Sequence, residues 1–307
     1  MQISGGVVLS GGVNLAPGSG GSSGGAYSFQ GSNYGYTSGG TIPPTGAVTN
    51  IIDKYSFTSD GNATDVGDLT TNKNVPAGQT SSDSGYTSGG DTQGWSDITN
   101  IIEKFPFSSD SNASDAGDLS VARRFMCGQS SSVNGYTSGG YTSTNTNIID
   151  KFPFSSDGNA TDVGDLSVND YGFAGQSSTD NGYATGAQGI EKFSFSSDGN
   201  ATDIGNLSSP RRGGSGQSST THGYQSGADN FSNVIDKFPF ASDTDATDVG
   251  DLSSTNYQSN MAGSSSTTSG YAVAQEGIDK YSFSSDGNAS DIGNLSVNRN
   301  LACGQQY

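Results

Sequence analysis

The chain has 307 residues, of which only 30% are hydrophobic, and a formal charge of −18. This acidic balance argues against a nucleic-acid partner, because excess carboxylates repel phosphates and the sequence contains no run of basic residues. No stretch is long and apolar enough to cross a membrane, so we expect no membrane insertion. The composition approaches that of disordered chains, yet apolar residues recur in a fixed register that disordered segments do not keep.

The first 26 residues form a separate N-terminal region by composition. The segment ISGGVVLSGGVNL repeats apolar residues every six positions and precedes the flexible linker APGSGGSSGG. One interpretation is a disordered tail. The other is a docking strand that adds to a sheet edge of another protein, which β-branched residues beside glycines favour. No positively charged region precedes a long apolar run, so we expect no secretory signal. The predicted docking residues are Ile3, Val7, Val8, Leu9, Val13 and Leu15.

From residue 27 to residue 307 the chain repeats one unit six times. A unit reads GQSS, then GYTSGG, a loop, NIIDKFPFSSD and ATDVGDLS, and each piece has the length and the flanking turn residues of a strand. Four short strands in about 45 residues are typical of a propeller blade. The sequence therefore predicts an all-β domain, a six-bladed β-propeller. The structural lysines that anchor the six repeats are Lys54, Lys104, Lys151, Lys192, Lys237 and Lys280.

The residue types predict where each strand lies in a blade. The small residues of GQSS suit the crowded innermost strand, and Phe105 and Phe107 lie on one strand face, where they would wedge between blades. The chain ends in RNLACGQQY, a first strand with no second strand after it. We expect it to complete the first blade and so hide the sheet edges. Cys127 and Cys303 then belong to blades three and one and should be free thiols.

Nearly all variation in repeat length lies in the loop between the second and third strands. Those loops lie on one side of the ring, and the two longest span residues 41–50 and 91–100. Variable loops on a rigid scaffold commonly carry binding sites, although tolerated drift in loop length explains the pattern equally well. The candidate binding residues are Ile42, Pro43, Pro44, Trp95 and Tyr141.

The acidic turn between the third and fourth strands has two interpretations. In the first repeat it carries Asp60, Asn62, Asp65 and Asp68, whose oxygens are of the kind that calcium prefers. However, Asp65 stands where an EF-type loop requires glycine. The favoured interpretation is turn chemistry, with one of these carboxylates pairing with Lys54 across its own hairpin.

A second basic position follows the repeat lysine by 19 residues. It holds Lys73, Arg123, Arg211 and Arg299, which would form either a partial basic ring that binds an anion at one channel mouth or local bonds to backbone carbonyls. The only histidine, His222, is replaced by Ser or Asn in other repeats, which disfavours a histidine-based catalytic or metal site. We therefore predict no catalytic residues, no cofactor and no metal site.

The repeat resembles kelch repeats. A tyrosine before a diglycine (Gly39-Gly40), a basic residue before the inner strand and an aromatic third strand carry the resemblance over roughly residues 27–307. Kelch repeats form β-propellers in which a C-terminal strand often closes the first blade. The sequence departs from the pattern, because leucines such as Leu69 replace the usual tryptophan of the fourth strand and the diglycine is lost in later repeats.

The motif KFPFSSDGNATDVGDL, together with GQSS and GYTSGG, is similar to sequences of kelch-like proteins of tailed bacteriophages that infect marine cyanobacteria. That resemblance implies a non-enzymatic virion protein, such as a capsid decoration, fibre or tail component. It would be present in multiple copies, anchored to other virion proteins by its arm, with its loops facing a host-surface glycan or protein. The alternative is a soluble intracellular kelch-type adaptor. A propeller enzyme such as a glycan hydrolase is the weakest hypothesis, because repeated acids are more often structural than catalytic.

Overall fold

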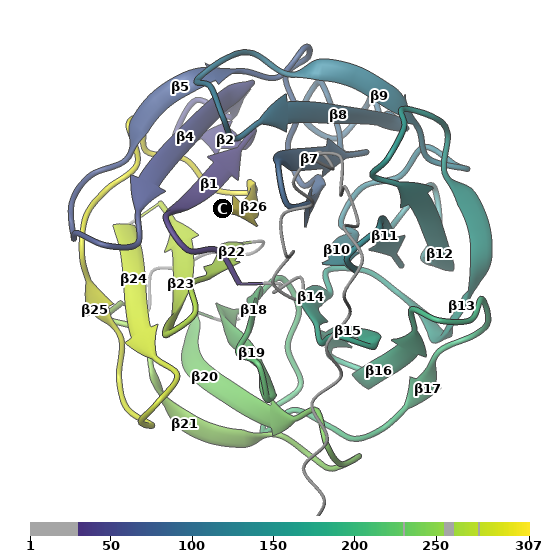
Figure 1. Ribbon diagram of the computed structural model, residues 1–307, viewed down its shortest axis with the longest axis vertical. Coiled ribbons are helices and arrows are strands. Elements are labelled where there is room, and N and C mark those ends of the chain that lie inside the picture. Colours follow the sequence, from purple (N-terminus) through teal and green to yellow (C-terminus); the bar gives the residue numbers. More distant parts are fainter. Residues whose placement is uncertain (1–29, 230, 255–260, 276) are drawn as a thin grey trace, which may run out of the picture.

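The computed structural model describes residues 30–229, 231–254, 261–275 and 277–307, and within these residues all helix-or-strand structure is β. Six four-stranded antiparallel sheets are arranged as blades around a central axis (Figure 1). The predicted six-bladed β-propeller is therefore confirmed. The predicted arm, residues 1–26, lies outside the described residues, and so do its six candidate docking residues. The described part of the chain contains no helix that could cross a membrane.

Each blade is formed by four strands, which follow one another from the axis outward. Blade 1 contains β26 (Cys303–Gln306), β1 (Tyr34–Ser38), β4 (Ile51–Ser56) and β5 (Thr64–Asp68); blade 2 contains β6 (Ala77–Thr80), β7 (Ser84–Ser88), β8 (Ile101–Pro106) and β9 (Ser114–Asp118); blade 3 contains β10 (Cys127–Ser130), β11 (Asn134–Ser138), β12 (Thr146–Pro153) and β13 (Thr161–Asp170). Blade 4 contains β14 (Ala174–Ser177), β15 (Asn181–Gly186), β16 (Gly189–Ser194) and β17 (Thr202–Asp203); blade 5 contains β18 (Ser215–Ser218), β19 (His222–Ala228), β20 (Ser232–Pro239) and β21 (Thr247–Asp251); blade 6 contains β22 (Ala262–Ser265), β23 (Ser269–Ala274), β24 (Gly277–Ser282) and β25 (Ser290–Asp291). A small hairpin, β2 (Thr41–Ile42) with β3 (Ala47–Val48), lies in the first loop.

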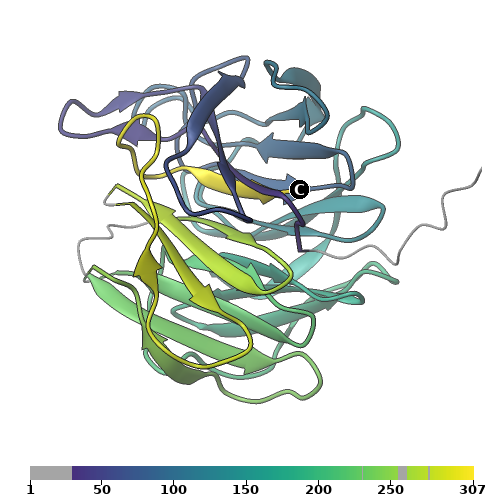
Figure 2. The ribbon, with the colours of Figure 1, turned by 60° about the vertical axis from the view of Figure 1, so that its left-hand side comes forward.

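The C-terminal strand closes the ring, as the sequence predicted. Strand β26 pairs antiparallel with β1, from Gly35 opposite Gln306 to Ser38 opposite Cys303. Figures 1 and 2 show this yellow strand beside the purple N-terminal strand. The first blade is thus built from both ends of the propeller domain.

Aromatic side chains wedge between neighbouring blades and form much of the core. The ring of Tyr36 in blade 1 lies 5.5 Å from the ring of Phe105 and 5.0 Å from that of Phe107, both in blade 2. The same three-ring arrangement recurs around the propeller, for example where Tyr86 meets Phe152 and Phe154. The predicted role of these aromatic residues is confirmed.

The small residues of the innermost strands allow close contact around the axis. A Cβ atom on Gly128 would lie only 2.0 Å from the carbonyl oxygen of Gly78 in the preceding blade, so this contact requires glycine. The following glutamine reaches the next blade, since Gln79 Nε2 donates to the backbone oxygen of Tyr136 at 3.1 Å. The predicted innermost position of the GQSS strand is therefore correct. Its glycine and glutamine make contacts with neighbouring blades.

The acidic turn binds the preceding blade, which corrects one prediction. Lys54 does not pair with a carboxylate of its own hairpin, where it lies opposite Thr64. Its Nζ instead lies 2.5 Å from Oδ1 of Asp110, in the turn of blade 2, and the Asp68 amide donates to Asn112 of that same turn. The turn of each blade folds over its predecessor. The six pairs are Lys54–Asp110, Lys104–Asp157, Lys151–Asp198, Lys192–Asp243, Lys237–Asp286 and Lys280–Asp60.

Candidate functional site

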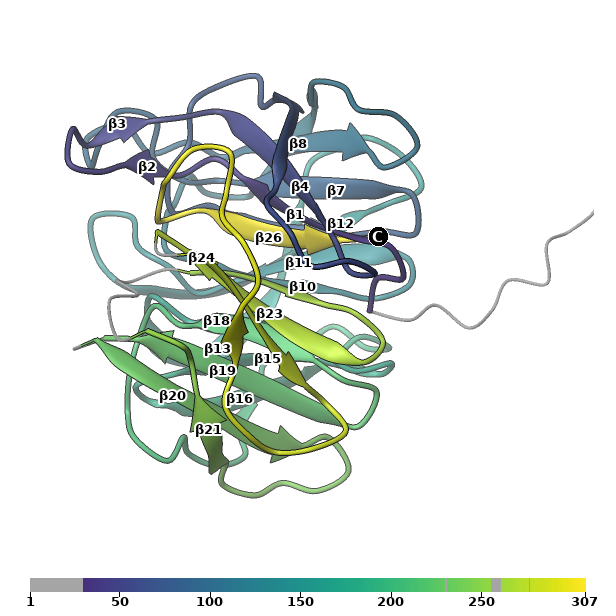
Figure 3. The ribbon, with the colours of Figure 1, turned by 90° about the vertical axis from the view of Figure 1, so that its left-hand side faces the viewer.

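The propeller has two different faces, which we name by their connections. The turn face carries the turns between third and fourth strands, and the loop face carries the variable loops between second and third strands. Gln30 Nε2 donates to the backbone oxygen of Ser218, and the Gly31 amide donates to that of Ser265. Both acceptors end inner strands on the turn face, so the described chain begins at the centre of the face opposite the loops. Figure 3 shows the β2–β3 hairpin on the opposite side from the C-terminus.

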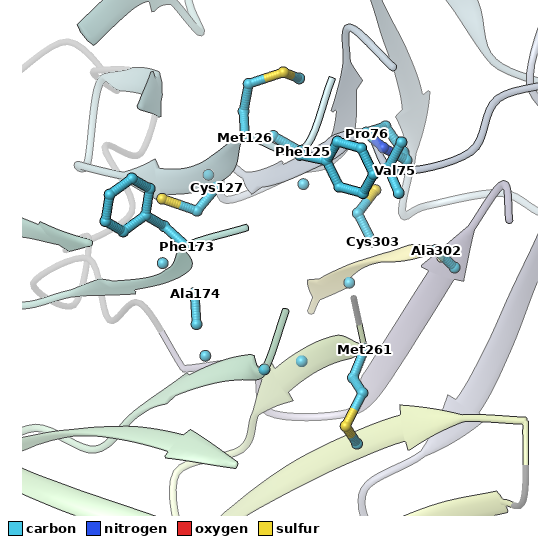
Figure 4. Close-up of a pocket in the computed structure, with 18 residues that line it drawn as sticks. Val75, Pro76, Phe125, Met126, Cys127, Phe173, Ala174, Met261, Ala302 and Cys303 are labelled. Carbon is cyan, nitrogen blue, oxygen red and sulfur yellow. The ribbon is translucent and has the colours of Figure 1, made fainter. Parts of the chain in front are cut away.

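A small funnel opens on the loop face where the inner strands begin. Its cavity volume is about 70 Å³, and Phe125, Phe173 and Met261 contribute to its wall (Figure 4). Backbone bonds tie its rim together, since the Phe125 amide donates to the Val75 carbonyl and the Gly172 amide donates to the Phe125 carbonyl. These bonds join the segments that enter neighbouring inner strands.

Both cysteines line this funnel and are free and buried, as predicted. Cys127 begins β10 in blade 3 and Cys303 begins β26 in blade 1, which confirms their assignment to separate blades. Burial raises the pKa of the Cys127 thiol to about 12 and raises the pKa of Cys303 as well. Both thiols are therefore protonated and poor nucleophiles near neutral pH.

Beside the funnel, aromatic rings and arginines gather in the loops of blades 2 and 3 and in the segments that follow β9, β13 and β17. Trp95 stacks on Phe125 with 5.4 Å between ring centroids and an angle of 12° between ring planes. Phe125 contacts Tyr171 at 5.5 Å, and Tyr171 contacts Tyr141 at 6.1 Å. We call this group, which also includes two arginines, the aromatic–arginine row. Its members are Trp95, Arg124, Phe125, Tyr141, Tyr171 and Arg212.

One buried carboxylate holds the outer end of the row. Asp91 is fully buried, and its Oδ2 accepts a 2.7 Å bond from Arg124 Nη1. Its Oδ1 accepts a 2.8 Å bond from the backbone amide of Trp95. Arg124 in turn places its guanidinium carbon 5.1 Å from the Trp95 ring and 5.4 Å from the Tyr141 ring. Asp91 thus holds both the backbone of Trp95 and the guanidinium of Arg124 in place.

A second arginine–carboxylate pair ends the row, between the end of β13 in blade 3 and the segment that connects blades 4 and 5. Arg212 binds Asp170 with Nε and Nη2, at 2.8 Å for the Nη2 bond, and its guanidinium carbon lies 5.3 Å from the Tyr171 ring. Asp170 is buried, and its bonds from Arg212 raise the pKa of that guanidinium further above its usual value. Arg212 is therefore a permanent cation held beside an aromatic ring.

The structure brings together some of the predicted loop residues. Trp95 and Tyr141 lie in the loops of blades 2 and 3 and meet around Arg124, and half of Trp95 is exposed (50%). Ile42, Pro43 and Pro44 lie instead at the β2–β3 hairpin of blade 1, outside the row. That these residues bind a partner stays a prediction.

Sequence reasoning missed Arg124, Phe125, Tyr171 and Arg212 as members of one group. All four lie in the segments that connect a fourth strand to the next inner strand. Their signal was present, because an arginine stands where two other repeats have Asn74 and Asn300, and an aromatic ring follows where other repeats have an aliphatic residue or Gly213. The sequence alone, however, does not show that these segments contact the variable loops that carry Trp95 and Tyr141.

The suggested ring of anion-binding cations is wrong. Arg123 is fully buried, donates from Nη1 to Asp150 at 2.7 Å, and bonds the backbone oxygens of Gly139 and Thr137. The alternative, bonds to backbone carbonyls, is confirmed for the arginines and for Lys73, whose Nζ donates to the Ile101 oxygen at 2.9 Å, and an unforeseen acid completes each pair. The four buried pairs are Lys73–Glu103, Arg123–Asp150, Arg211–Asp236 and Arg299–Asp53.

The acidic turns serve contacts between blades. In the first turn Asp60 pairs with Lys280 and Asn62 accepts from the amide of Asn294, both in blade 6, whereas Asp65 accepts from the amide of Gly67 in its own strand. Within the described residues, no group of three or more histidine, cysteine, aspartate or glutamate side chains is arranged to hold a metal ion.

Comparison of the sequence with protein-family models gives no match, and comparison with curated proteins gives none either.

Proposed function

We propose that the chain is a non-enzymatic virion component, a kelch-like propeller that is anchored through its N-terminal arm and displays its loop face. The sequence resemblance to kelch-like proteins of tailed cyanobacterial phages motivates the virion assignment. One structural observation carries the display role. Gln30 and Gly31 lie at the centre of the turn face, and the exposed Trp95 lies on the opposite face. A chain held by its N-terminal region would therefore present its variable loops outward.

The surroundings of the recurrent acids support a non-catalytic role. Each acid of the Lys–Asp pairs is a contact between blades, and the acids of the buried pairs fix backbone connections. Most glycoside hydrolases need two carboxylates placed on either side of the bond that is cleaved. The repetition of these acids therefore has a structural explanation.

The experiment is fractionation of the native source on a density gradient, with the full chain followed by mass spectrometry. We expect co-migration with intact particles in fixed stoichiometry. A variant without residues 1–29 should remain in the soluble fraction while keeping its thermal unfolding temperature. Recovery of the full chain in the soluble fraction alone would overturn the proposal in favour of the intracellular adaptor.

A further inference from the structure

We propose that the aromatic–arginine row binds a neutral saccharide, with Trp95 as the principal stacking surface. This inference rests on the proposed function, because it supplies the ligand class for the displayed loop face. It is carried by three properties of the row, namely its exposed rigid ring, its ordered hydrogen-bonding groups and its compensated charge.

The first property is a tryptophan whose ring is exposed to solvent and whose backbone conformation is fixed. The Trp95 side chain is 50% exposed although its ring stacks on Phe125, and its φ of +89° is one that side-chain-bearing residues rarely adopt. Such strained backbone persists only where its surroundings enforce it, in this loop through the bond from the Trp95 amide to Asp91. A rigid exposed ring offers a flat apolar surface to the carbon–hydrogen face of a pyranose at low entropic cost.

The second property is the placement of planar polar groups between the rings. Arg124 uses Nη1 for its bond to Asp91, and Arg212 uses Nε and Nη2 for Asp170. A guanidinium has five N–H donors, so Arg212, whose side chain is 32% exposed, keeps the donors of Nη1 for ligand oxygens. Neighbouring hydroxyls of a sugar are acceptors at the spacing that a planar fork can bind. Apolar surface with a few fixed polar groups is the usual composition of a ligand site.

The third property is charge compensation, which selects a neutral ligand. Each arginine of the row is paired with its own buried aspartate, so the row offers no uncompensated cation. The chain as a whole has a charge of −18, which disfavours approach of an acidic polysaccharide. A cationic ligand is disfavoured too, because Arg124 already occupies the space between the Trp95 and Tyr141 rings. A neutral sugar satisfies both the rings and the remaining donors.

The test uses the purified full chain on an array of neutral and acidic oligosaccharides built from hexoses, N-acetylhexosamines, uronic acids and sialic acids. We expect binding to at least one neutral oligosaccharide with little dependence on salt. Trp95→Ala should weaken that binding at least tenfold. Phe231→Ala is the matched control, because Phe231 is another exposed aromatic residue at positive φ on the same face but outside the row. It should bind as the unmodified protein does.

A second variant separates a local effect from a folding effect. Arg212→Lys keeps the charge but loses the planar donors, and we expect weaker saccharide binding at an unchanged thermal unfolding temperature. Binding to no neutral saccharide, binding to acidic ones alone, or equal loss in Trp95→Ala and Phe231→Ala would each overturn the inference. So would attachment to host cells that resists periodate but is abolished by protease, which would indicate a protein partner.

The two proposals fail separately. A chain that co-migrates with particles but binds no neutral sugar keeps the virion role and loses the saccharide site. A chain that binds sugars through Trp95 but never co-migrates with particles keeps the site and loses the virion role.

Discussion

The backbone amide of Gln306 donates a hydrogen bond to Oγ1 of Thr80, at 3.2 Å. It is one of six bonds in which the backbone amide of the last residue of an inner strand donates to a side-chain oxygen in the next blade. The others run from Thr80 to Ser130, Ser130 to Ser177, Ser177 to Ser218, Ser218 to Ser265, and Ser265 to Gln306. All six run in one direction, so the chain's last strand completes a closed circle of bonds.

Removal of residues 299–307 should open that circle. The loss of β26 leaves β1 as an unpaired inner edge and removes the bonds of Gln306, so we expect a large fall in the thermal unfolding temperature and a broader transition. The control is a circular permutant in which residues 299–307 precede residue 32, since Tyr307 bonds the Tyr34 backbone. The permutant should unfold as the full propeller does. An unchanged melting temperature in the truncated chain would contradict the closure.

Gly128→Ala should destabilise the propeller by about 2–3 kcal/mol or more, as overpacking does where the backbone cannot shift. The added Cβ would meet the Gly78 carbonyl oxygen at 2.0 Å, and both atoms belong to packed inner strands. Gly158→Ala is the control, because a Cβ there meets no atom within 4 Å. Urea unfolding of both variants checks the prediction. Equal effects would show that the inner strands have room to move.

The two kinds of ion pair should differ in strength. Arg299→Met leaves the Asp53 carboxylate buried without its cation and should cost about 3–5 kcal/mol. Lys280→Met removes a partly exposed pair with Asp60 near the same junction of blades and should cost under about 1 kcal/mol. Unfolding in low and in 1 M salt distinguishes them, since salt should diminish only the exposed pair's contribution. A larger effect of Lys280→Met would contradict this ranking.

Tyr55 compensates for a missing glutamine. Blade 6 has Ser264 where five blades have glutamine, and the Tyr55 hydroxyl bonds Ser264 Oγ at 2.5 Å, in a place where most blades have phenylalanine. Tyr55→Phe should therefore cost about 1–2 kcal/mol, the usual cost of an unpaired buried hydroxyl. Adding Ser264→Gln to that variant restores the arrangement of the other blades and should recover much of the loss. A double-mutant cycle measures this coupling, and additive effects would refute it.

The propeller should lose stability above about pH 9. Burial raises the pKa of Cys127 from 9.0 to about 12, and burial also raises the pKa values of Tyr86 and Tyr224 from 10.0 to about 12. The unfolded chain therefore releases these protons at lower pH than the folded chain, and stability falls by up to about 1.4 kcal/mol per pH unit for each group. Urea unfolding between pH 8 and 11 tests this.

Cys127→Ala is the control for the alkaline loss, because Ala77 and Ala174 occupy the equivalent positions. It should reduce the slope that begins near pH 9 and leave the tyrosine contribution above pH 10. Thiol reagents should leave the native chain unlabelled at pH 8. A slope that is unchanged in the variant would mean that Cys127 ionises equally in both states.

The sequence predicted the blades but not the contacts between equivalent positions. Period and strand length identified six blades and their closure, because β26 continues a pattern that begins at β1. The partner of Lys54 could not be identified, since every repeat offers the same aspartate and only the fold tells Asp60 from Asp110. The buried arginines were misjudged because their acids, such as Asp150, stand next to the exposed repeat lysines. The aromatic–arginine row joins loops of different blades, and the spacing of residues in the sequence does not show which loops contact one another.

Each of the twelve basic residues of the chain takes part in an ion pair with a different acid. The whole formal charge of −18 therefore belongs to carboxylates outside those pairs. To a neighbouring copy the propeller presents the field of a polyanion, whose range is about 10 Å at 0.1 M salt. Densely arrayed copies would repel one another sideways and collect a layer of counterions. The charge of the molecule would thus set the distance between neighbouring copies, and a higher salt concentration would shorten it.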